Sequence, residues 1–128
     1  MASLSPEGSG NLQEPIGNLC LGNWIFPPAL TANTDNYDPT DLQNTSVIVL
    51  TDNGGGPYNL TGLVAQAAGK IIALVNNSAE SIILKHNDGS TLANRFFGPN
   101  SSDVTLRTNG WVFVIYDTTT QKWRIMGA

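Results

Sequence analysis

The chain has 128 residues, the length of one ordinary domain, and 41% of them are hydrophobic, which is enough for a single core. Charged residues make up only 12%, about half the share of a typical soluble domain. The net charge is −4 and every Lys and Arg lies at or after Lys70, so the first half carries only acids. This distribution argues against a nucleic-acid-binding protein, which needs a basic surface to neutralise phosphates.

The single cysteine, Cys20, excludes an intrachain disulfide and favours folding in a reducing cytoplasm. Because Cys20 sits in the apolar stretch LCLGNWIF, we expect it to be a small buried hydrophobe. The first residues lack the basic and apolar regions of a signal peptide, and no apolar run approaches the length of a membrane span. We therefore expect no membrane partner.

The N-terminal segment differs in composition from the rest of the chain. Residues 1–19 combine Ser, Gly, Pro, Glu and Asn with isolated apolar residues, among them Leu12 and Ile16. Such a segment cannot bury enough apolar surface to order itself. The sequence therefore predicts an extended arm over residues 1–22 and one domain over residues 23–128.

Residues 19–28 are apolar and contain two aromatic residues two positions apart. That spacing places Trp24 and Phe26 on one face of a strand, which Pro27 and Pro28 then end. The segment is either an edge strand that covers one end of the core or an aromatic anchor that docks on a neighbouring molecule. The residues alone leave both interpretations open.

From residue 46 onward the chain reads as short strands separated by turns, with no helix. The predicted strands cover residues 46–51, 70–76, 81–86, 103–106, 110–117 and 122–126, and another begins near residue 58. Short strands at this spacing, bounded by Gly, Pro, Asn, Asp and Ser, predict an all-β, antiparallel β-sandwich or barrel of about eight strands. The core candidates are Ile48, Leu50, Ile72, Leu74, Ile82, Leu84, Val112, Val114 and Trp123.

Candidate chemistry is sparse. His86 and Asp88 could form an acid–base pair, but the NDG that contains Asp88 is also a hairpin turn signal. Asp35, Asp38 and Asp41 invite a calcium site, yet they lack the pattern of an EF-hand loop. We therefore expect no catalytic residue, no cofactor and no metal.

Arg95 lies between apolar and aromatic neighbours in the sequence NRF. Its fork of donors suits the carbonyl groups of its own loop, and equally a carboxylate of another subunit. Both roles stay open.

Four segments in fixed order resemble a β-sandwich module of phage structural proteins. They are DNYDPTDLQNTSVIVLT, YNLTGLVAQAAGKIIALVNNSAESIILKH, STLANRF and VFVIYDTTTQKWRI, which together cover most of residues 30–128. The resemblance implies a jelly-roll-like sandwich that is commonly trimeric. Such modules occur in tail-fibre and baseplate proteins and in small capsid decoration, or cement, proteins.

The short chain, without the repeats or coiled coil of a fibre shaft, favours the capsid. We therefore expect a homotrimer on the outer capsid surface of the virion that bridges copies of the major capsid protein and stabilises the shell. The predicted capsid or subunit contacts are Leu12, Ile16, Trp24, Phe26 and Arg95. A tail-fibre or baseplate component, such as a receptor-binding tip, is the first alternative. A carbohydrate-binding module or hydrolase domain outside any virion is the second.

Overall fold

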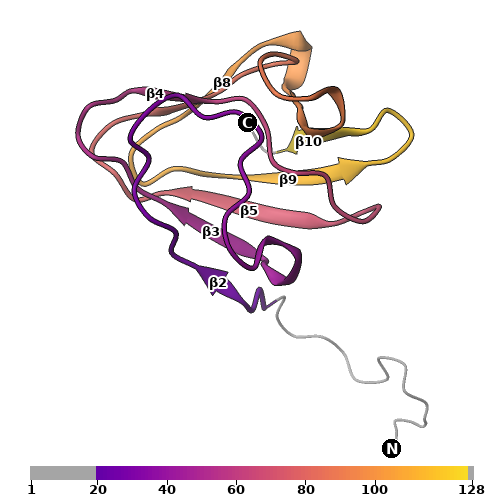
Figure 1. Ribbon diagram of the computed structural model, residues 1–128, viewed down its shortest axis with the longest axis horizontal. Helices are drawn as coiled ribbons and strands as arrows, with labels where there is room; N and C mark the ends of the chain where they lie inside the picture. The colour runs from indigo at the N-terminus through magenta and orange to yellow at the C-terminus, as the bar shows by residue number, and fades with distance from the viewer. Residues whose placement is uncertain (1–19, 127–128) are drawn as a thin grey trace, which may run out of the picture.

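The computed structural model describes residues 20–126, which form an all-β fold of two sheets (Figure 1). This confirms the fold class expected from the strand pattern. Three single turns of 3-10 helix, η1 (Leu42–Asn44), η2 (Leu92–Asn94) and η3 (Pro99–Ser101), interrupt the strands. The described strands are β2 (Trp24–Ile25), β3 (Val47–Leu50), β4 (Tyr58–Leu60), β5 (Ile71–Asn76), β6 (Ile82–Leu84), β7 (Phe96–Phe97), β8 (Val104–Leu106), β9 (Trp111–Asp117) and β10 (Lys122–Met126).

The larger sheet has six strands in the order β2-β3-β5-β9-β10-β7, and the smaller has three in the order β4-β6-β8. In Figure 1 the strands β2, β3, β5 and β9 of the larger sheet lie side by side in that order, with β4 and β8 above them. β2 stands at the edge of the larger sheet, as the prolines after it predict.

The strand pairing is mixed, so the prediction of a wholly antiparallel sandwich is wrong. β9 is antiparallel to β5 and β10, and β6 to β8, but β3 is parallel to both β2 and β5. The chain leaves β3, passes through β4 in the other sheet and returns as β5 in the same direction. Alternation of apolar residues is the same in both kinds of pairing, so it does not reveal the strand direction.

The core lies between the two sheets and contains every residue that the alternation assigned to it. All nine predicted core side chains are buried. Trp123 is completely buried, and its indole Nε1 donates a hydrogen bond to the carbonyl of Leu63 at 2.9 Å. The alternate residues of each strand point away from this core, which places them on the opposite face of the sheet.

The turn between β9 and β10 is organised by Asp117. Its carboxylate accepts hydrogen bonds from the Thr119 amide at 2.9 Å and the Thr120 hydroxyl at 3.0 Å. The guanidinium of Arg124 also donates to it at 2.7 Å, and these donors lower the pKa of Asp117 to about 2. The Asp side chain thus closes the turn and sets the register of the two strands.

Candidate interaction surface

The face of the larger sheet that points away from the core is apolar across several strands. In β5 and β9 the residues that alternate with the buried core positions are themselves apolar, except for Asp117 at the end of β9. Val47 and Val49 have the same position in β3. We call this surface the outer face. Its members are Trp24, Val47, Val49, Ile71, Ala73, Val75, Trp111, Phe113, Ile115 and Met126.

The strand register arranges these residues in rows across the sheet. One row runs from Trp24 through Val47, Ala73 and Phe113 to Met126. This row therefore crosses the five adjacent strands β2, β3, β5, β9 and β10, and every side chain in it is apolar.

A second row joins Val49, Val75 and Trp111, parallel to the first. A third joins Ile71 and Ile115, and it ends at the charged side chain of Arg124. The apolar surface is thus continuous in both directions and is bounded by charge on β10.

Several of these side chains are exposed. Trp111 is 58% exposed, Trp24 54% and Ile71 44%. Val47, Val49 and Ala73 are buried beneath their neighbours, and Leu21 is the one described residue outside the strands that packs against this small cluster. The face therefore exposes large apolar side chains around a buried centre.

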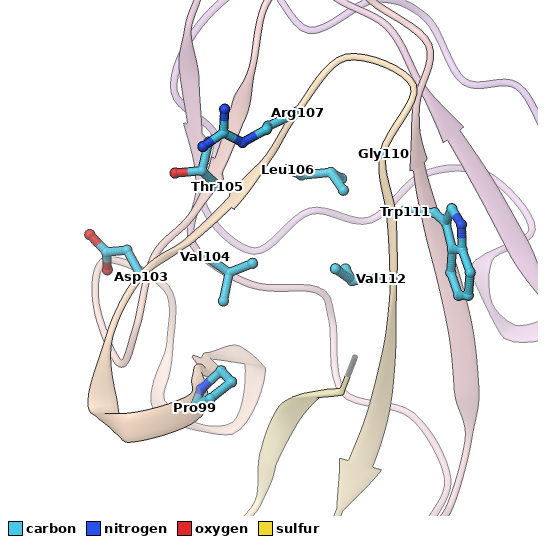
Figure 2. A pocket seen from close by; sticks show the side chains of 9 residues that line it. All are labelled: Pro99, Asp103, Val104, Thr105, Leu106, Arg107, Gly110, Trp111 and Val112. Atoms are coloured by element: carbon cyan, nitrogen blue, oxygen red, sulfur yellow. The ribbon is translucent and has the colours of Figure 1, made fainter. Parts of the chain in front are cut away.

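Figure 2 shows the pocket between β8 and β9, with Trp111 as its one labelled residue of the outer face. Val104 and Leu106 of β8 and Val112 of β9 point into a cleft of about 460 Å³ between the two sheets, whereas the Trp111 side chain lies on the opposite side of β9. On the rim, the carboxylate of Asp103 accepts hydrogen bonds from Lys85 Nζ and from the amide of His86, both at 2.8 Å. The cleft is an open end of the core, and Trp111 belongs to the outer face.

The composition of the strands indicates whether the outer face is covered. A sheet with one wetted face alternates apolar and polar residues, whereas strands buried on both faces read as near-continuous apolar runs. The runs VIVL in β3, IIALV in β5 and WVFVIY in β9 are of the second kind. This sheet has the composition of one that is covered on both sides.

The structure brings only part of the predicted contact set together. Trp24 lies on the outer face, where its indole Nε1 donates to the Leu21 carbonyl at 2.7 Å. Phe26 follows directly after β2 and is 72% exposed, whereas Leu12 and Ile16 lie outside the described residues. The edge-strand and the aromatic-anchor interpretations of this segment therefore both retain support. β2 is an edge strand, and the side chains of Trp24 and Phe26 are exposed.

Arg95 lies apart from these residues and organises its own loop. Its Nε donates to the Ser90 carbonyl at 2.8 Å and its Nη1 to Asn87 Oδ1 at 3.4 Å. The Arg95 carbonyl accepts from the amide of Trp123 at 2.9 Å. These contacts favour the intramolecular role, and a contact with another subunit stays a prediction.

His86 and Asp88 have separate local partners. His86 Nδ1 accepts a hydrogen bond from the Gly98 amide at 3.1 Å, and its ring stacks on Phe97 at 4.9 Å between centroids. The carboxylate of Asp88 accepts from the Gly89 amide. These contacts suit a histidine that ties two loops together.

Within residues 20–126 there is no group of three or more His, Cys, Asp or Glu side chains arranged to hold a metal ion. The carboxylate of Asp35 accepts instead from the Thr61 hydroxyl at 2.7 Å. In the same part of the chain, no helix is long and apolar enough to cross a membrane. Cys20 is exposed, so the prediction of a buried thiol is wrong; it precedes β2, outside both sheets.

The outer face was not among the predicted sites, apart from Trp24, although the sequence carries a signal for it. The predicted core uses only one face of each strand, and the residues on the other face are also apolar. The same three apolar runs that predict strands also predict burial on both sides.

Comparison of the chain with protein-family models, with curated proteins and with solved structures yields no match.

Tyr37 offers a prediction about alkaline stability. Its hydroxyl is buried and has no hydrogen-bond partner among the described residues, and burial raises the pKa of Tyr37 to about 12. Below pH 10 the phenol is neutral in both the folded and the unfolded chain, so stability is unaffected there. Between pH 10 and 12 only the unfolded chain releases the proton, and the free energy of unfolding should fall as the pH rises.

Urea denaturation from pH 8 to 12 measures this effect, with Tyr37→Phe as the matched variant. The variant should lose less stability over the alkaline range, because other tyrosines titrate equally in both proteins. Parallel pH profiles for the two proteins would contradict the prediction.

Proposed function

We propose that this protein is a bacteriophage capsid decoration protein that binds the outer capsid surface as a homotrimer and stabilises the shell. The outer face carries the proposal, because an apolar surface across five adjacent strands suits a protein that works by packing against other protein chains. The ordered motifs that resemble the phage β-sandwich module support the same proposal.

The proposed fold relationship is a jelly-roll-like sandwich. Two sheets around one core support it. Four parallel pairs depart from the antiparallel order of such a sandwich: β2 with β3, β3 with β5, β4 with β6 and β7 with β10. The proposal therefore takes the module to be a variant with mixed strand pairing in both sheets.

The proposed mechanism is mechanical. Each trimer bridges neighbouring copies of the major capsid protein, and it engages several sites at once, so modest contacts per copy give tight binding. If the trimer binds the mature shell and not its dissociated subunits, it stabilises the shell by mass action.

The proposed capsid contact is the N-terminal segment with the exposed aromatic residues that follow it. Leu12 and Ile16 supply isolated apolar side chains, and Trp24 and Phe26 are exposed where that segment joins the larger sheet. This position leaves both aromatic side chains available to a partner.

Deletion of residues 2–18 should abolish binding to mature shells while the oligomer keeps its number of subunits. The double variant Leu12→Ser/Ile16→Ser should reproduce the loss, and Leu4→Ser serves as the matched control. Co-sedimentation with shells that lack the protein measures the binding. A truncated protein that decorates shells as well as the full chain would refute this contact.

The virion location itself is tested by quantitative peptide mass spectrometry of purified particles. We expect a fixed ratio to the major capsid protein. A few copies per particle would replace this proposal with a tail-fibre or baseplate component. Absence from the particle would refute both virion assignments.

A further inference from the structure

The geometry points to the outer face as the subunit interface, with a second copy of this chain as its occupant. The inference rests on the proposed self-assembly of the chain and names the surface that forms the assembly. It moves the subunit contact away from Arg95 and onto β3, β5 and β9, and it leaves Trp24, on the edge strand β2, to the capsid contact.

The first argument is size. The strands β3, β5, β9 and β10, spaced about 4.8 Å apart, span about 14 Å, and three rows along the strands add about 14 Å, so this part of the face projects on the order of 200 Å². Apolar patches of a few hundred Å² are often functional. A stable interface buries about 800 Å² on each partner, so the outer face would form its apolar centre and the surrounding polar residues would supply the rest.

The second argument is composition. Lasting interfaces between identical chains resemble a domain core cut in half, with charged residues at the border. Val47 and Ala73, at the centre of the outer face, are already buried within one chain, so a second copy would contact the exposed Ile71 and Trp111 and the partly exposed Phe113 around them. The first charge met across it is Arg124, which is already paired with Asp117 at 2.7 Å. Covering this face therefore leaves no unpaired charge at its centre.

The third argument decides between occupants. A decoration protein is synthesised as a free protein and binds the mature shell later. A face that only the shell covered would therefore stay exposed to solvent until binding. A continuous apolar patch left in that state is an aggregation hazard. Another copy of the chain is present as soon as the protein is made, and it carries the same apolar surface.

The N-terminal segment is the remaining candidate occupant, because Leu21, which follows it, packs against the buried cluster of the outer face. The residues before Leu21 fit the rest of the face less well. In residues 12–19 the large apolar residues are Leu12, Ile16 and Leu19, at spacings of four and three. In an extended segment Leu19 would point to the opposite side from the other two. One side of such a segment therefore offers two large apolar side chains to a face of three rows.

The test is the oligomeric state of the purified full-length chain. Sedimentation equilibrium over a range of concentrations should give the mass of an oligomer for the wild type. Trp111→Lys and Ile71→Lys each place a charge on the outer face and should shift the mass to that of one chain. Leu92→Lys is the matched control, because Leu92 is 62% exposed on η2, away from the outer face, and should keep the wild-type mass.

A wild type that sediments as one chain overturns the inference, and so does a folded Trp111→Lys variant with the wild-type mass. If the lysine variants do not fold, hydroxyl-radical labelling of the wild type gives the answer. Trp111 should then be protected to the degree of the buried Trp123, and labelling at the rate expected for an exposed indole overturns the inference.

Deletion of residues 2–18 separates the two occupants. The inference expects Trp111 to stay protected in the truncated oligomer. Loss of that protection would assign the face to the N-terminal segment. An oligomer that is absent from virions would leave the interface in place and refute the capsid function, so the two proposals fail separately.

Discussion

Replacement of Trp123 by alanine is expected to lower the free energy of unfolding by about 3–5 kcal/mol. The side chain is completely buried and is the largest in the core. Its ring meets Tyr116 edge-on at 5.1 Å between centroids, and its Nε1 donates to the Leu63 carbonyl at 2.9 Å. The substitution removes this packing, leaves a cavity and deprives a buried carbonyl of its donor.

Chemical denaturation followed by circular dichroism measures the loss. Trp123→Phe should recover part of it, because a ring remains against Tyr116 while the hydrogen bond is lost. Leu92→Ala is the control and should change stability by less than about 0.5 kcal/mol, as expected for an exposed site. Equal stability of Trp123→Ala and the control would contradict this account of the core.

Asn76→Ala is expected to cost at least about 2 kcal/mol, because the amide satisfies several buried groups at once. Asn76 is fully buried on β5. Its Nδ2 donates to the carbonyls of Glu80 at 2.8 Å and Leu106 at 2.9 Å, and its Oδ1 accepts from the Ser78 amide at 2.9 Å. Since Leu106 belongs to β8, the side chain also ties the two sheets together.

Asn77→Ala is the matched control, because the neighbouring Asn77 is exposed. Denaturation midpoints should separate the two variants, and amide exchange in residues 76–80 should accelerate only in Asn76→Ala. Matching exchange rates in both variants would show that the buried amide does not hold this turn.

Much of the fold was predictable because short strands leave a local pattern. Alternation around Ile72 and Val114 identified both the strands and their inward faces, and all nine core assignments are confirmed. β7 was missed because it has two residues, and its pairing with β10 depends on a contact distant in sequence. The parallel pairs were missed because alternation carries no information about strand direction.

The candidate surface was less predictable for a related reason. Local pattern shows which residues share a face, but it does not show whether that face is covered in the finished molecule. Trp24 was identified because it stands two positions from Phe26 in an apolar stretch, which places both on one face of a strand. Trp111 and Ile71 were interpreted only as parts of strands, and their common surface became visible once the order of β3, β5 and β9 was known.

The strand order has a consequence for the time at which the chain becomes able to associate. Val47, Ala73 and Phe113 lie far apart in the chain, and Phe113 joins the other two only when β9 docks beside β5. A nascent chain that ends before β9 lacks four of the ten outer-face residues and also lacks β5's second partner strand. If the chain associates through the outer face as proposed, the complete surface therefore forms only late in synthesis from the N-terminus, after β9 and β10 have been made.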